Sequence, residues 1–226
     1  MPAPHRGEHV THRLIFACEA NICRSPLMEQ VLRSRAEADL WEITSAGTRV
    51  GPGGRPMCTV STEVALSVQP GEGAVEHRSA PIDADALRAA QLVLTASRAE
   101  RSVIAQLVPE TRSKTFTLRE AIHLGSEPLR SEELAAIADL IGDSPADGLD
   151  AYAAALHRRR GFVMPPAAGR TLWGKRRPNA FDIPDAHHGR PREHRSMLER
   201  TALDVAELHR QLDAFLTASD TDPAAG

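Results

Sequence analysis

A cysteine and an arginine six positions apart, Cys18 and Arg24, lie in the run CEANICRS, which ends at Ser25. A short apolar segment, residues 14–17, precedes the cysteine, and Pro26 follows the serine. Proline is favoured at the first position of a helix. A loop that leads into a helix N-terminus turns backbone N–H groups inward and adds partial positive charge, which suits an anion. The pattern therefore predicts an anion-binding loop between a buried strand and a helix.

These three side chains suit nucleophilic chemistry on a phosphate group. A cysteine at the start of such a loop has its thiolate stabilised, and the thiolate is the nucleophilic form. The planar guanidinium of Arg24 matches two phosphate oxygens and can follow their charge into the transition state. The hydroxyl of Ser25 can donate to the sulfur, both before attack and when the sulfur leaves. We expect phosphoryl transfer through Cys18.

The elements that must position this loop alternate between strands and helices along the chain. This alternation predicts an α/β fold, a four-stranded parallel sheet with helices on both faces and the loop at the carboxyl end of a strand. The predicted strands are residues 14–17, 41–45, 91–95 and 114–118, and the predicted helices are residues 26–38, 60–68, 97–107 and 193–217.

The 226 residues are expected to form one domain. We predict a flexible arm over residues 1–11, the domain over 12–217 and a disordered tail over 218–226. An insertion over about 125–179 is longer than an ordinary connection. Two short helices, 131–141 and 149–160, are predicted in it. The insertion could form a lid in which the basic runs 158–160 and 175–177 attract acidic partners while Phe162 and Trp173 supply aromatic surface. In the alternative, its helices pack away from the site.

The composition limits the partners and the cellular compartment that we expect for this protein. The net charge of -3 gives no reason to expect nucleic acid or an anionic membrane as partner. No apolar run approaches the length of a signal peptide or membrane span, and three cysteines are an odd number for a disulfide scaffold. We expect a cytoplasmic protein with reduced thiols that needs no cofactor. The oligomeric state cannot be predicted.

Two motifs resemble one known family. Residues 18–26, CEANICRSP, are similar to the signature C-x-G-N-x-C-R-S-P of low-molecular-weight protein tyrosine phosphatases. Residues 182–189, DIPDAHHG, resemble the D-x-P-D-P-Y-Y-G segment of that family. The resemblance implies a cysteinyl-phosphate intermediate, with Cys18 as nucleophile, Arg24 as phosphate clamp and Asp185, rather than Asp182, as general acid.

The same resemblance assigns the remaining site residues. Residues 45–48, SAGT, resemble the end of the second strand of the family. The resemblance implies that Ser45 supports the loop together with Asn21 and Ser25. The loop residues implied to bind the phosphate of the substrate, a phosphorylated protein or a small phosphomonoester, are Glu19, Ala20, Asn21, Ile22, Cys23, Arg24 and Ser25.

Departures from the signatures raise specific questions. Ala20 replaces a glycine, which matters if that position needs a positive φ. Glu19 adds a negative charge that is expected to point to solvent. His187 and His188 replace aromatic residues expected to grip a phosphotyrosine ring. Two adjacent histidines without a third partner are a weak metal signal, so we expect no metal.

The cysteines outside the nucleophile bear on regulation and on the competing functions. Cys23 is predicted to form a reversible disulfide with Cys18 under peroxide. Arsenate reductases share this fold and loop but need further redox thiols, and here only Cys58 is available. A non-catalytic phosphate-binding module is the alternative from another class. Phosphoarginine phosphatases of the family favour threonine at the position of Ile22, so Ile22 favours phosphotyrosine-like esters.

Overall fold

The computed structural model describes residues 12–68, 76–126, 148–164, 166 and 179–220. Their centre is a parallel sheet with the strand order β2-β1-β3-β4. The strands are β1 (His12–Cys18), β2 (Trp41–Gly47), β3 (Leu92–Thr95) and β4 (Thr115–Thr117). The predicted four-stranded parallel sheet is therefore confirmed.

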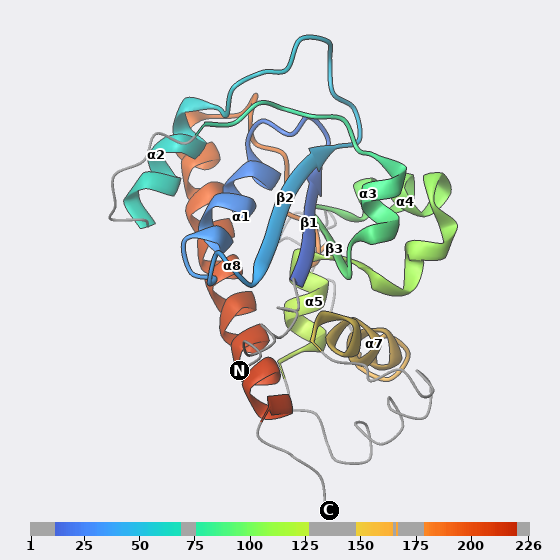
Figure 1. The fold of residues 1–226 in the computed structure, drawn as a ribbon. Coiled ribbons are helices and arrows are strands. Elements are labelled where there is room, and N and C mark those ends of the chain that lie inside the picture. The colour runs from blue at the N-terminus through green and yellow to red at the C-terminus, as the bar shows by residue number, and fades with distance from the viewer. Residues whose placement is uncertain (1–11, 69–75, 127–147, 165, 167–178, 221–226) are drawn as a thin grey trace, which may run out of the picture.

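Helices cover both faces of the sheet (Figure 1). One face carries α1 (Arg24–Arg33), α2 (Thr59–Val68), α5 (Leu118–Leu124) and α8 (Pro191–Asp220). The other carries α3 (Ala84–Ala89) and α4 (Arg98–Leu107), followed by the 3-10 helix η1 (Pro109–Lys114). Side chains of a strand alternate between faces, so in β1 Leu14 and Phe16 enter the first core while Ile15 and Ala17 enter the second.

Several element boundaries differ from the predicted ones. The helix after the loop begins at Arg24, two residues before Pro26, and ends at Arg33. Just after this end, the hydroxyl of Ser34 donates a hydrogen bond to the carbonyl of Val31. The helices α3 and α5 were not predicted because they are short, and their N-caps Asp83 and Thr117 define them more clearly than any apolar periodicity. Helix α8 continues to Asp220, so part of the predicted tail is helical. The arm and the helix predicted over 131–141 lie outside the described residues.

Helix α7 (Leu149–Arg159), in the predicted insertion, packs at the amino-terminal edge of the sheet. Its residue Asp150 accepts a hydrogen bond from Gln91, just before β3, at 2.8 Å. Gly148, with φ 68°, leads into it so close to β1 that a Cβ there would lie 2.8 Å from the ring of His12. Figure 1 shows α7 at the end of the sheet opposite the β1–α1 loop.

The position of α7 bears on the predicted lid. The described part of the insertion follows the alternative in which its helices pack away from the site. Phe162, just after α7, is 86% exposed and belongs to this distant end. Trp173 and the basic run 175–177 lie outside the described residues.

Among the described residues, no helix has both the length and the apolar character needed to cross a membrane.

Candidate active site

The loop from Cys18 to Arg24 joins β1 to α1 at the carboxyl edge of the sheet, where the strand order changes direction. This is the usual place for a ligand in an open α/β sheet. Cys18 is buried, and its Sγ accepts hydrogen bonds from the backbone N–H of Asn21 at 3.3 Å and the hydroxyl of Ser25 at 3.0 Å. Donors placed in this way accommodate a negatively charged sulfur.

Asn21 holds the loop in shape. With φ 54°, it is the one described non-glycine residue of positive φ, a conformation that asparagine tolerates better than most residues. Its side-chain amide donates to the hydroxyls of Ser25 and Ser45, both at 2.9 Å, and accepts from the N–H of Ala80 at 2.9 Å. The left-handed position of the loop is thus occupied by Asn21, and Ala20 carries no penalty for replacing a glycine.

Two further residues support this network and were not predicted. Glu29, buried on α1, accepts a hydrogen bond of 2.6 Å from Ser45. His77 Nε2 lies 2.8 Å from the carbonyl oxygen of Asn21. The spacing of Glu29, four residues after Ser25 and so on the same helix face, is the signal from which its role could have been inferred.

Arg24 is fixed from three sides. Its Nη1 lies 3.4 Å from Oε1 of the buried Glu100 and donates to the carbonyl of Ile183 at 3.3 Å, while Nη2 donates to Asp185 at 2.7 Å. Glu100, from the first turn of α4, was not predicted, because an acid there is explained equally well by helix capping. The guanidinium is therefore held at the mouth of the loop before any substrate contact.

Residues 182–189, which we call the acid segment, bring the two candidate aspartates into different surroundings. Ile183 anchors the segment, with its N–H bonded to the carbonyl of Ala96 at 2.8 Å. Asp182 accepts from the backbone N–H and guanidinium of Arg98 at the start of α4. Asp185 instead faces Arg24. The geometry brings Asp185, and not Asp182, to the loop.

The pKa of Asp185 reflects this position. Burial raises it, but the N–H of His187, which donates to Oδ1 at 3.0 Å, and the positive charge of Arg24 outweigh burial, so the pKa lies below its ordinary value. The carboxylate is thus held in its charged form beside the guanidinium.

The remaining predicted loop residues occupy the same turn. Glu19 points outward to Arg49, with Oε1 and Nη1 3.1 Å apart, and the Arg49 side chain is largely exposed whereas that of Glu19 is about half exposed. Ile22 is buried, and its carbonyl accepts from the N–H of Cys58 at 2.9 Å. All the predicted site residues from both motifs and Ser45 are therefore brought together at one edge of the sheet.

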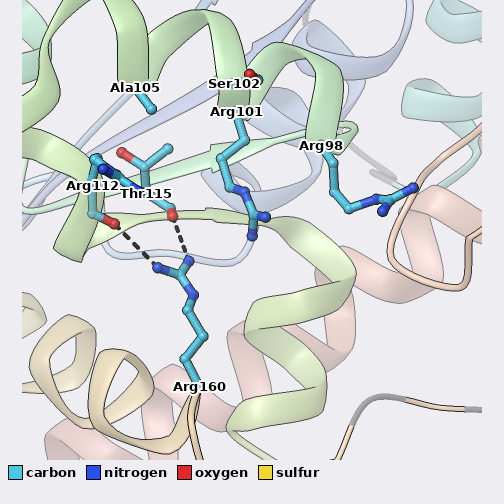
Figure 2. A pocket seen from close by; sticks show the side chains of 7 residues that line it. All are labelled: Arg98, Arg101, Ser102, Ala105, Arg112, Thr115 and Arg160. Carbon is cyan, nitrogen blue, oxygen red and sulfur yellow. Dashed lines mark hydrogen bonds between the residues drawn. The ribbon is translucent and has the colours of Figure 1, made fainter.

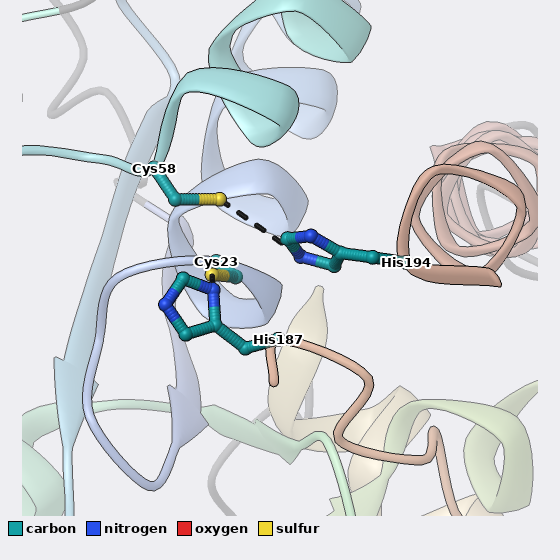
Figure 3. A group of neighbouring side chains, drawn as sticks. All are labelled: Cys23, Cys58, His187 and His194. Atoms are coloured by element: carbon teal, nitrogen blue, oxygen red, sulfur yellow. Dashed lines mark hydrogen bonds between the residues drawn. The ribbon is translucent and has the colours of Figure 1, made fainter. Parts of the chain in front are cut away.

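Beside the loop lies a cluster that sequence reasoning missed, formed by Cys23, Cys58, His187 and His194 (Figure 3). The contact with Cys58 and burial both raise the pKa of Cys23, whereas the contact with Cys23 lowers that of Cys58, against burial, to about 5. His188, which neighbours His187 in the sequence, is outside the cluster.

A separate pocket of about 300 Å³ lies along the β4 edge, between α4 and the end of α7 (Figure 2). Arg160 reaches into it and donates to the carbonyls of Arg112 at 3.2 Å and Thr115 at 2.7 Å. Arg160 also pairs with Glu120 and covers the ring of Phe116. The basic run 158–160 is therefore partly engaged in packing, and this pocket contains no predicted site residue. Its lining residues are Arg98, Arg101, Ser102, Ala105, Arg112, Thr115 and Arg160.

Comparison with known proteins agrees with this geometry. The model of the family described as low molecular weight phosphotyrosine protein phosphatase matches residues 13–136. A protein-arginine-phosphatase of Bacillus subtilis is 32% identical over 111 residues, which cover 48% of this chain and 71% of that protein.

Solved structures share the fold. The arginine phosphatase YwlE from Geobacillus stearothermophilus matches with a TM-score of 0.59 and 20% identity, over 95% of this chain and 99% of its own. The tyrosine phosphatase Wzb from Escherichia coli K30, in complex with sulphate, matches with a TM-score of 0.53 and 17% identity, over 88% of this chain and 96% of its own.

These relatives are phosphatases, so the alternative of an arsenate reductase is not favoured. With its matching family model and its cysteine-containing loop at the carboxyl edge of the sheet, the chain belongs to the low molecular weight phosphotyrosine protein phosphatase family and is a phosphoric monoester hydrolase.

Proposed function

We propose that the enzyme dephosphorylates protein side chains through a cysteinyl-phosphate intermediate. The observation that carries this proposal is the convergence of three groups on one loop. The Cys18 sulfur lies within reach of two hydrogen-bond donors, Arg24 is held in place by Glu100, and Asp185 lies 2.7 Å from Arg24.

In the first step, the Cys18 thiolate attacks phosphorus while the loop N–H groups and Arg24 hold the phosphoryl oxygens. The bond from phosphorus to the leaving group breaks as the bond to sulfur forms. When the phosphate group engages Arg24, its negative charge favours the protonated form of Asp185, which then supplies a proton to the leaving atom. Proton transfer of this kind contributes about a hundred- to ten-thousand-fold in rate. In the second step, Asp185 accepts a proton from water, which attacks phosphorus and releases the sulfur, with Ser25 donating to it.

The substrate class depends on the loop position of Ile22. An isoleucine offers only apolar contact, which suits an aryl ring better than a charged guanidinium. We therefore propose phosphotyrosine as the preferred side chain. Phosphoarginine is the second candidate, because the curated relatives are named protein-arginine-phosphatases.

The test compares kcat/KM on two peptides of the same sequence, one carrying phosphotyrosine and the other phosphoarginine. The wild type should prefer phosphotyrosine, and Ile22→Thr should shift the ratio toward phosphoarginine. Preference of the wild type for phosphoarginine would overturn the assignment of substrate but not the mechanism.

The mechanism has its own test. Cys18→Ser should abolish turnover of both peptides while the circular dichroism spectrum remains that of the wild type, because a serine hydroxyl is not ionised at neutral pH. Turnover by pure Cys18→Ser protein would contradict the proposed nucleophile. A wild type inactive on every phosphopeptide and on aryl phosphates would instead favour the non-catalytic phosphate-binding module.

A further inference from the structure

We propose that Cys23, Cys58, His187 and His194 bind a structural zinc ion beside the active site. Their four ligand atoms lie within 4.8 Å of one another. The Cys23 Sγ and His187 Nδ1 are 3.0 Å apart, and the Cys58 Sγ and His194 Nε2 are 4.0 Å apart (Figure 3). We refer to these residues as the Cys2His2 cluster.

The geometry fits a tetrahedral site. Zinc bonds to sulfur at about 2.3 Å and to nitrogen at about 2.0 Å, so neighbouring ligand atoms in a tetrahedron are roughly 3.3 to 3.8 Å apart. The two contacts of 3.0 and 4.0 Å lie on either side of this range, and small side-chain rotations would equalise them. Two thiolates and two neutral imidazoles also give the donor set and charge of structural zinc sites.

Burial distinguishes the cluster from a chance surface grouping. Cys23 and His194 are 8% and 5% exposed, and the other two members are half-buried. With four protein ligands, such a site has no open position for water, which is the pattern of structural rather than catalytic zinc.

Two simpler arrangements explain less of the cluster. A disulfide between Cys23 and Cys58 would join the sulfurs but give no reason for two imidazoles to meet there. Hydrogen bonding alone would not require four segments of the chain to converge. These segments are the start of α1, the residue before α2, the acid segment and the first turn of α8. A metal ion accounts for all four groups.

A metal here would join the two motifs of the active site. Cys23 belongs to the loop, whereas His187 follows Asp185 by two residues and donates its N–H to that carboxylate. Zinc would thus hold the acid segment against the loop. It would also engage the Cys23 thiolate, so the disulfide predicted between Cys18 and Cys23 could form only after metal loss. The metal site itself does not depend on the proposed function; only its effect on Asp185 does.

The test uses the full chain without a histidine tag, purified under reducing conditions. Metal analysis should find about one zinc per chain. Apo protein titrated with Co²⁺ should develop the visible absorption of tetrahedral cobalt with a thiolate charge-transfer band. Because this titration uses the wild-type chain, a negative result cannot be attributed to the misfolding of a variant.

Variants assign the ligands. Cys58→Ser and His194→Ala should each weaken zinc binding by more than about a hundredfold, since loss of mere outer-shell partners already costs 10- to 100-fold. Matched controls are His188→Ala, next to a ligand, and Cys18→Ser, next to the cluster, and both should keep the wild-type affinity. Because Cys18→Ser is catalytically inert, its zinc binding tests the site separately from the proposed reaction.

Three results would overturn the proposal. The first is the absence of both zinc uptake and the cobalt spectrum in reduced wild-type protein. The second is unchanged affinity in the Cys58→Ser, His194→Ala double variant. The third is a Cys23–Cys58 disulfide as the main form of freshly purified protein.

Discussion

Arg24 and Glu100 form an ion pair behind the phosphate-binding loop, with Nη1 and Oε1 3.4 Å apart and side chains only 5% and 6% exposed. Loss of one partner of a buried pair leaves an uncompensated charge and costs about 3–5 kcal/mol. Because the same guanidinium also contacts Asp185, Glu100 sets the plane in which Arg24 meets both the acid and the phosphate. We infer that Glu100 is a positioning residue.

Glu100→Gln should therefore lower kcat/KM about a hundredfold, the scale of a misplacement of about 1 Å. Inhibition by inorganic phosphate should weaken in parallel. Glu100→Asp, which keeps the carboxylate, should retain part of the activity and part of the inhibition by phosphate. The matched control is Glu110→Gln, which removes the same charge from an exposed pair with Arg88 and should leave activity unchanged. Equal activity of the two glutamine variants would exclude the positioning role.

Asn21→Ala should be more damaging than Ser45→Ala. The first change removes three side-chain hydrogen bonds and places alanine at φ 54°, whereas the second removes contacts to Asn21 and Glu29 only. Unsatisfied buried groups cost about 1–3 kcal/mol each, so thermal unfolding should detect the difference. Asn21→Gly, which relieves the backbone but not the lost bonds, should fall between the two. The reverse order of Asn21→Ala and Ser45→Ala would show that the loop depends on Ser45 instead.

Asp185→Asn should slow alkyl or peptide phosphates far more than activated aryl phosphates, because only poor leaving groups need a proton. A plot of log kcat/KM, which reports the first step, against leaving-group pKa should therefore become steeper. Asp182→Asn serves as the comparison, since this carboxylate contacts Arg98 rather than Arg24. A steeper dependence in Asp182→Asn alone would mean that the acid has been misassigned.

The Arg98–Asp182 pair should give stability that depends on pH. Burial raises the pKa of Asp182, but hydrogen bonds and charge from Arg98 lower it further, so the folded pKa lies below the ordinary value. Such a group stabilises the fold above the unfolded pKa of about 3.9, and this contribution is lost as pH falls through the folded value.

Chemical denaturation of wild type and Asp182→Asn should thus differ by up to about 1 kcal/mol near pH 6, because the pair is partly exposed, and converge in stronger acid. Asp39→Asn, on an exposed turn, removes the same charge and controls for net charge. A difference that persists unchanged in acid would show that the charge of Asp182 is not its source.

The sheet and the loop could be predicted because their signals are local. The apolar run 14–17, the residues 18–25 and Pro26 are consecutive, so strand, loop and helix follow from one short stretch. Glu100 and His77 could not be predicted in the same way, because their partners Arg24 and Asn21 are distant in sequence. The Cys2His2 cluster is the extreme case, since neither cysteine alone indicates a metal site and only the fold places His187 and His194 beside them. The position of α7 likewise depends on contacts with both β3 and α8.

Helix α8 connects the two ends of the molecule. His194, in its first turn, belongs to the Cys2His2 cluster, whereas Gln211 and Phe215 contact Tyr152 of α7. Gln211 lies 17 positions after His194, which is about 26 Å along a helix. Substitutions in α7 therefore act on the distal half of α8 and leave the half that carries His194 unchanged. The contacts of α7 with α8 are thus close to five helical turns away from the residue that joins the cluster.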